Sequence, residues 1–243
     1  MNLFRSMRER FGNLFGAVIG SIALLGCGLL FALVFAPQQK LEARRIERLP
    51  IMDAETVTSA TDGEEILITG RVEGDALPEV REFIAYALEV WNVTPADADD
   101  PDDEPNGSWE DVKTILPELK LNMGDEKVPL LSAENVTFGG ALHEEIVRSS
   151  GNLSAESEGE WLADGTQRYK GLYFGDLTTV LGVKASIGGV IPDELFAGDR
   201  VTFIESQHEA AKGLLIAGVS MVVCSPVVLV GGILSAIFGR RRR

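Results

Sequence analysis

The stretch that decides the architecture is Phe11–Ala36, FGNLFGAVIGSIALLGCGLLFALVFA, which contains no Asp, Glu, Lys or Arg. A second run without these residues is Gly213–Gly239, GLLIAGVSMVVCSPVVLVGGILSAIFG. As a helix, each run would reach about 35 Å or more, which exceeds the roughly 30 Å hydrocarbon core of a bilayer. The sequence therefore predicts transmembrane helices at 11–36 and 213–239. They would separate a basic N-terminus (1–10), an extramembrane domain (37–212) and a basic tail (240–243).

The charge distribution indicates an orientation in the membrane and argues against nucleic acid as a partner. The 243 residues carry a net charge of −15 although both ends are basic, so acidic residues are concentrated in the middle and nucleic acid is not an expected partner. Because Lys and Arg favour the cytoplasmic side, both termini are expected in the cytoplasm of a cell membrane, with 37–212 extracytoplasmic. Lys40, Arg44, Arg45 and Arg48 oppose this orientation, but long translocated domains follow the charge rule weakly.

The first run also contains two processing patterns. Val34–Ala36 resembles a signal-peptidase site, and Leu24–Cys27 resembles a lipoprotein box. The run is too long for a usual signal peptide and stays apolar after Cys27, so a retained anchor is favoured. Cys27 and Cys224 both lie within the apolar runs, and the middle domain therefore has no thiol for a disulfide or a zinc site.

Small residues recur along both apolar runs. Gly12, Gly16 and Gly20 stand four residues apart in the first run, and in the second run Gly231 and Gly232 each stand four residues before a small residue, Ser235 and Ala236. Small residues at this spacing allow another helix to approach closely. Packing of the two helices against each other is favoured because glycine is frequent in membrane helices, and a homo-oligomer through the first helix is the alternative.

The middle domain is predicted to be rich in β-structure. Runs with strand composition and flanking turn residues occupy Glu64–Glu73, Arg81–Val93, Thr114–Asn122, Lys127–Leu131, Glu134–Phe138, Tyr169–Phe174, Leu177–Lys184 and Arg200–Glu205. His143–Ser149 is ambiguous, and loops are expected at 95–108, which is acidic, and at 150–164. Pro37 is expected to end the first helix, and the capping box Ser206–Glu209 is expected to start the second near Gln207.

Two segments share one glycine frame. Gly63–Gly70 (GEEILITG) and Gly175–Gly182 (GDLTTVLG) each combine a turn, an extended core and a closing glycine. A glycine inside a strand marks a bulge or a close approach of another backbone. The repeated frame favours paired, barrel-like β-elements, with a chance spacing of glycines as the alternative. We therefore expect a mainly β domain, formed by two small barrel-like units, between two transmembrane helices.

The order of these features resembles a known family. The residues that carry it are Arg44-Arg45-Ile46, Pro50, ILITGRV at Ile66–Val72, Tyr86–Trp91, Leu119–Leu131 around Gly124-Asp125, Tyr169, Gly175-Asp176 and Val180–Gly182. Over most of residues 14–238 the chain is similar to the GIDE-type, or "beside a membrane" (BAM), domain of the mitochondrial ubiquitin ligase activator and its prokaryotic relatives. The family of transmembrane protein 43 (LUMA) is a weaker second match.

The resemblance implies an interaction or regulatory module held beside a membrane, with a protein partner that it does not identify. The eukaryotic ligase carries a RING zinc domain, which needs about eight Cys or His ligands, after its second helix. This chain ends at Arg243 with no cysteine after Cys224, so ubiquitin-transferase activity is not expected.

Few residues suggest catalysis. Ser186 follows Lys184 as in a Ser–Lys pair, but the glycine of a nucleophile elbow is missing and Gly188-Gly189 favours a turn. His143 precedes two glutamates but has no second histidine at the spacing of a zinc site. A solvated polar stretch is the favoured interpretation of His143.

The acidic loop offers the only candidate metal ligands. Asp97, Asp99 and Asp103 could hold Ca²⁺, although Pro101 breaks the alternating ligand pattern and a solubilising loop is favoured. No cofactor is predicted. The favoured function is a non-enzymatic two-pass membrane protein whose partners are the lipid bilayer and a second protein. A membrane-tethered hydrolase using Ser186 or His143 and a cation sensor are the alternatives.

Overall fold

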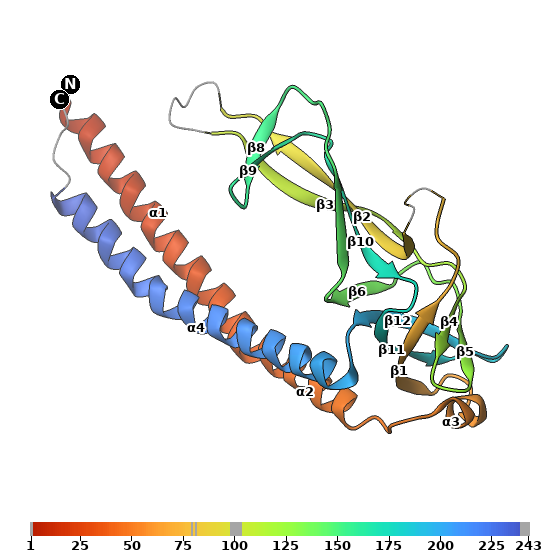
Figure 1. Ribbon diagram of the computed structural model, residues 1–243. Helices are drawn as coiled ribbons and strands as arrows, with labels where there is room; N and C mark the ends of the chain where they lie inside the picture. The colour runs from red at the N-terminus through yellow and green to blue at the C-terminus, as the bar shows by residue number, and fades with distance from the viewer. Residues whose placement is uncertain (1, 79, 81, 98–103, 239–243) are drawn as a thin grey trace. The chain divides into compact units, whose positions relative to one another are not determined.

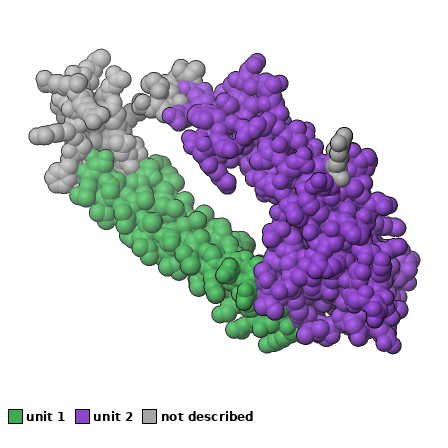
Figure 2. Space-filling view, in the orientation of Figure 1, with its two compact units in different colours: residues 1–48, 204–243 green, residues 49–203 purple. Residues whose placement is uncertain are grey.

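The computed structural model describes residues 2–78, 80, 82–97 and 104–238, and of residues 2–14 and 236–238 it describes only the backbone. The chain divides into two compact units, which Figure 2 distinguishes by colour. Residues 1–48 and 204–243 form a helical unit, and residues 49–203 form a β-rich unit. The expectation of a β-rich domain flanked by two long apolar helices is therefore confirmed.

Two long helices make up the helical unit. The first combines α1 (Asn2–Leu30), the π-helical turn η1 (Phe31–Phe35) and α2 (Ala36–Glu47), and the second is α4 (Arg200–Phe238). Both are long and apolar enough to span a membrane. The prediction that Pro37 ends the first helix is wrong, because the helix continues to Glu47. The wider π-helical turn before Pro37 accommodates a ring that would clash with the carbonyl of Leu33 in a regular helix.

The two helices contact each other through small and polar residues. Ser21 Oγ donates to the carbonyl of Ser225 at 3.0 Å, and Ser225 Oγ donates to the carbonyl of Ser21 at 2.8 Å. At Gly28 the backbones are so close that an added Cβ would lie 2.7 Å from the carbonyl oxygen of Gly218. Large apolar side chains such as Leu33 are exposed on the same unit. At these positions the helices therefore contact each other through small residues, while Leu33 and other large apolar residues of the apolar runs are exposed.

The second helix begins earlier than its capping box predicts. Asp199 is the N-terminal cap of α4, since its Oδ1 accepts hydrogen bonds from the backbone nitrogen and the hydroxyl of Thr202, each at 2.8 Å. Both the start near Gln207 and the strand expected at Arg200–Glu205 are wrong. The β-branched residues of that segment have strand propensity, but the Asp199 cap satisfies free amides of a helix instead.

A closed five-stranded barrel forms the base of the β-rich unit (Figure 1). Its strands are β1 (Glu65–Glu73), β4 (Leu119–Asn122), β5 (Lys127–Leu130), β11 (Leu177–Lys184) and β12 (Val190–Ala197). They pair in the order β11-β1-β4-β5-β12, and pairing of β11 with β12 closes the ring. All neighbours are antiparallel except β5 and β12. This is the Greek-key connectivity of OB-fold barrels. The expected two barrel-like units are therefore one barrel.

The glycine frame lies in two adjacent barrel strands. β1 and β11 pair antiparallel, with Ile66 opposite Gly182 and Gly70 opposite Thr178. A Cβ at Gly70 would lie 2.5 Å from the carbonyl oxygen of Asn122, and one at Gly182 would lie 2.3 Å from that of Ile191. Both glycines thus allow the close approach of a neighbouring strand that the sequence predicted, and β11 is bulged at Leu181/Gly182.

A second sheet is built from the two long insertions of the barrel. β2 (Phe83–Thr94) and β3 (Asn106–Ile115) lie between β1 and β4, and β7 (His143–Val147) and β10 (Gln167–Tyr173) lie between β5 and β11. They pair in the order β3-β2-β10-β7. The prediction at Thr114–Asn122 is wrong, because this segment contains the end of β3 and the whole of β4, and β3 already begins inside the expected acidic loop.

Three further elements complete the unit. β6 (Thr137–Gly140) pairs parallel with β12 at the edge of the barrel sheet. The polar segment 150–164 contains the hairpin of β8 (Ser154–Ser157) and β9 (Glu160–Ala163), so the expected loop is wrong there. Helix α3 (Ala54–Ser59) contributes Ala54 and Val57 to the apolar core inside the barrel.

The two ends of the β-rich unit are joined by Arg200. Its Nη1 donates to the carbonyl of Pro50 at 3.2 Å, and its Nη2 donates to the carbonyl of Leu49. Residues at the start and the end of the unit therefore lie within the reach of one side chain.

Candidate functional site

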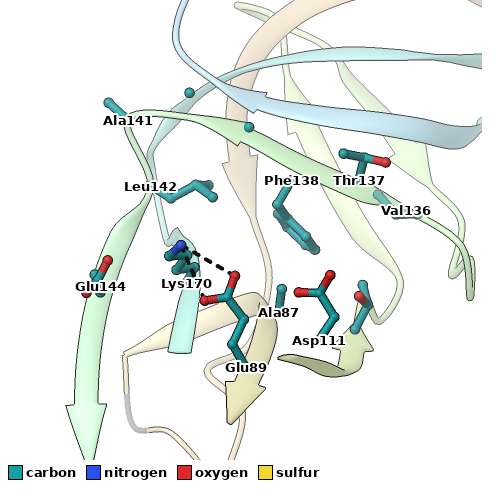
Figure 3. A pocket seen from close by; sticks show the side chains of 13 residues that line it. Ala87, Glu89, Asp111, Val136, Thr137, Phe138, Ala141, Leu142, Glu144 and Lys170 are labelled. Carbon is teal, nitrogen blue, oxygen red and sulfur yellow. Dashed lines mark hydrogen bonds and ion pairs between the residues drawn. The ribbon is translucent and has the colours of Figure 1, made fainter. Parts of the chain in front are cut away.

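A cavity of 610 Å³ lies between the second sheet and β6. The sheet contributes charged side chains from all four of its strands, and β6 with its flanking residues contributes apolar ones. Figure 3 shows Glu89, Asp111 and the ring of Phe138 directed toward the same space. The cavity therefore has a charged wall and an apolar wall.

The charged wall is held in place by ion pairs. Glu89 on β2 pairs with Arg168 on β10, and Lys170 Nζ lies 3.3 Å from Glu89 Oε2. The guanidinium of Arg168 also lies 4.1 Å from the centre of the Trp109 ring, where a cation is attracted by the aromatic face. Because one carboxylate contacts two cations of the neighbouring strand, this part of the wall is fixed in position and its carboxylate is neutralised.

Two further carboxylates of the wall have no such partner. Neither Asp111 on β3 nor Glu144 on β7 forms an ion pair with another described residue. Opposite them, Val136, Phe138 and Leu142 supply apolar surface. Free carboxylates beside apolar surface suit a Lys or Arg side chain, which has a cationic head on an apolar stem.

The strand β7 forms an open edge beside this cavity. It is the last strand of the second sheet, and all five of its side chains are exposed. An edge strand presents unpaired amide and carbonyl groups that can pair with another extended chain. Glu144 and Glu145 make this edge acidic, so a second copy of β7 would place like charges together. An extended basic segment fits the edge better.

The structure brings His143 to an aspartate and a tyrosine. His143 Nε2 lies 3.3 Å from Asp176, and the imidazole stacks on the Tyr173 ring with centroids 3.9 Å apart. Burial raises the pKa of Tyr173, and Glu82 nearby adds to this effect. Asp176 Oδ2 also accepts a hydrogen bond from the backbone nitrogen of Tyr173 at 2.7 Å, which stabilises the β10–β11 turn. The cluster therefore has a direct structural role.

Ser186 and Lys184 are close in sequence but are not joined by a hydrogen bond. Lys184 is buried at the end of β11 and its Nζ donates to the carbonyl of Ala185 at 3.2 Å, whereas Ser186 is exposed in the following turn. A Ser–Lys nucleophile requires the amine to accept the hydroxyl proton through a hydrogen bond. The described geometry does not provide that contact.

The predicted cation ligands are only partly described. Asp97 is exposed after β2, and Asp99 and Asp103 lie outside the described residues. Within the described part of the chain, no group of three His, Cys, Asp or Glu side chains is placed to hold a metal ion.

Of the predicted packing glycines, Gly16, Gly20 and Gly231 make no close contact with the other helix where the structure describes it. An added Cβ at Gly16, Gly20 or Gly231 would have no neighbouring atom within 4 Å, whereas Gly28 and Gly218 are in close contact. Gly12 lies in the part of α1 described by its backbone alone, and Gly232 lies in α4. Homo-oligomerisation through the first helix remains a prediction.

The sequence did not single out Glu89, Asp111 or Lys170. Each is a charged residue inside a β-strand, and such residues usually face solvent. Glu89 is a charged residue within the otherwise apolar strand FIAYALEVWNVT, and this contrast is the sequence feature that could have indicated a functional role. A comparison with protein-family models, with curated proteins and with solved structures found no match.

Proposed function

We propose that this chain is a non-enzymatic, two-pass membrane protein of the cell membrane whose β-rich domain binds a protein partner. Both termini are cytoplasmic and residues 37–212 are extracytoplasmic. The two helices support this proposal, since they are long and apolar enough to span a membrane and have exposed apolar side chains. Membership of the GIDE-type family is part of the same proposal, and a ubiquitin-transferase activity is not.

The partner presents an extended segment with Lys or Arg side chains. This proposal depends mainly on one observation, which is that two carboxylates without ion pairs, Asp111 and Glu144, line a cavity beside the open edge of β7. The backbone of the segment pairs with β7 and its cationic side chains enter the cavity. Backbone pairing supplies affinity in this recognition mode, and the side-chain pocket supplies specificity.

The two edges of the second sheet allow a matched experiment. Val147 on β7 and Val112 on β3 are both exposed, at 47% and 59%. A photo-crosslinking amino acid replaces one valine at a time in the full chain, in cells that express it at its natural level. We expect a discrete crosslinked protein from position 147 and none from position 112, and loss of the product in the double variant Asp111→Asn, Glu144→Gln.

Equal crosslinking from both edges, or a product that survives the double variant, contradicts the proposed interface. Protease treatment of intact cells tests the orientation separately, and digestion of the tails with protection of the middle domain contradicts it. The hydrolase alternative has its own test. Labelling by a serine-hydrolase probe that disappears in Ser186→Ala favours an enzyme over an interaction module.

A further inference from the structure

The helical unit contains a groove between α2 and α4, which lie side by side (Figure 1). Its volume is 420 Å³. Ala36 and Ala211 are buried beside it and Leu215 lines it, so the inner surface is apolar. Alanine at both buried positions leaves the space that larger side chains would fill. The groove is therefore a consequence of small residues at a helix contact.

The groove lies where both helices change from apolar to charged. Ala36 is the last residue of the first apolar run, and Lys212 directly precedes the second. A helix that crosses a bilayer places such a border at the level of the lipid headgroups, because charged residues avoid the hydrocarbon core. This step rests on the membrane-spanning function proposed above.

Three nitrogen-bearing side chains surround the groove, and two of them lack an acidic partner. His208 Nε2 lies 3.4 Å from Glu47 Oε2, so this pair is internally compensated when the histidine is protonated. Lys40 and Lys212 form no ion pair with a described residue. The other acidic residue of α2, Glu42, pairs with Arg45. Two ammonium groups thus flank an apolar groove, and neither is paired with a carboxylate of the described residues.

We propose that this groove binds an anionic phospholipid, with its phosphate between Lys40 and Lys212 and one acyl chain along Ala36, Ala211 and Leu215. Lysine binds phosphate as a point charge, and basic pockets between membrane helices bind anionic headgroups. The apolar surface selects a lipid over a soluble phosphate, because only a lipid fills both parts of the site. The bound lipid also accounts for basic residues on the side of the membrane where the charge rule does not expect them.

Lipid retention by the full chain tests this site. The protein is purified in a neutral detergent and titrated with 1-palmitoyl-2-oleoyl phosphatidylglycerol, and bound lipid is counted by native mass spectrometry. We expect a saturable phosphatidylglycerol site, weaker binding of phosphatidylcholine, and no competition by glycerol phosphate. In Lys40→Gln with Lys212→Gln, affinity falls about 25-fold, because each lysine near an anionic lipid is worth about a fivefold change.

The matched control removes two positive charges outside the groove. Arg44 and Arg48 are exposed and do not line it, so Arg44→Gln with Arg48→Gln keeps the affinity within about twofold. Ala211→Leu fills the apolar part and weakens phosphatidylglycerol binding while leaving the charges unchanged. Equal losses in both charge variants, or no effect of Ala211→Leu, overturns the site. Competition by glycerol phosphate identifies a soluble anion as the ligand and also overturns it.

A separate measurement distinguishes this inference from the proposed function. The chain is reconstituted into vesicles of phosphatidylcholine alone and extracted at alkaline pH. Failure to insert contradicts the membrane-spanning function. Insertion without any preference for phosphatidylglycerol contradicts only the lipid site.

Discussion

The helical unit and the β-rich unit differ in how they treat their large apolar side chains. In the helical unit Ser21 and Ser225 are only 6% and 3% exposed, whereas Leu33 and Val227 are each 68% exposed. In the β-rich unit Leu195 is fully buried, as apolar residues in water-soluble domains usually are.

The membrane-spanning function proposed above accounts for this difference through the solvent around each unit. In water, burial of apolar surface drives folding, which explains the apolar core of the barrel. In lipid, apolar side chains gain nothing by leaving the solvent, so helices associate through close backbone contacts and hydrogen bonds. The Ser21–Ser225 hydrogen bonds and the Gly28–Gly218 contact are interactions of this second kind.

The largest expected effect comes from truncating matched leucines in the two units. Leu195→Ala removes a fully buried side chain from the barrel core and should cost about 2–5 kcal/mol. Leu33→Ala should change stability by less than about 0.5 kcal/mol in detergent, because the side chain is already exposed. Chemical unfolding followed by far-UV circular dichroism measures both, and an equal loss contradicts the comparison.

Gly182→Ala tests closure of the barrel and should cost about 1–3 kcal/mol, since the new Cβ would lie 2.3 Å from the carbonyl oxygen of Ile191. All three tryptophans lie in the β-rich unit, so tryptophan fluorescence during unfolding follows this unit alone. Gly63→Ala is the control, because its φ of +79° carries strain but its Cβ meets no atom within 4 Å. A larger loss in the control argues against the close strand contact.

The paired serines of the helical unit should give a smaller effect. A double-mutant cycle with Ser21→Ala and Ser225→Ala measures the contact between the two hydroxyls and is expected to yield a coupling energy of about 0.6 kcal/mol, the average for hydrogen bonds between membrane helices. Each single variant removes the contact between the two hydroxyls and one hydroxyl-to-carbonyl hydrogen bond but leaves the other, so each should lose only part of the stability. Reversible unfolding in mixed micelles measures the coupling, and a value near zero contradicts the contact.

The smallest effect concerns the cap of α4. A hydrogen bond from Thr202 lowers the pKa of Asp199 below its ordinary value of 3.8, so the folded state favours the ionised form. The resulting stability is present above pH 3.8 and is lost as the pH falls through the lowered pKa. Asp199→Ala should lower the melting temperature at pH 7. Asp199→Asn, also a good cap, should keep most of the stability that the cap contributes but should lose its dependence on acid pH.

The sequence predicts the features that depend on neighbouring residues. The apolar runs, the strands β1, β2, β5, β10 and β11, and the two glycine frames could be recognised because periodicity and turn chemistry are local. β12 was missed because Pro192 argues against a strand, and the structure accommodates it beside the bulge at Leu181/Gly182. β8 and β9 were missed because only Ala155 and Leu162 among their residues are buried.

The cavity could not be predicted from local pattern. Glu89 and Lys170 lie on strands that are distant in sequence, and only the pairing of β2 with β10 brings them together. Asp199 is a good N-terminal cap residue, but the β-branched residues after it favour a strand. The sequence therefore predicted the start of the helix at the capping box of Ser206 instead. The strand propensity of Arg200–Glu205 is outweighed by the Asp199 cap, whose effect depends on geometry that the sequence does not show.

The hydrogen bonds from Arg200 to the carbonyls of Leu49 and Pro50 have a practical consequence for protein engineering. A domain whose first and last residues lie close together can be expressed alone or inserted into a surface loop of another protein. Its ends can also be linked and new termini made at another position, which is circular permutation. Residues 49–203 therefore suit insertion into another protein as a domain. The exposed turn at Ile187 suits the new termini of a circular permutant.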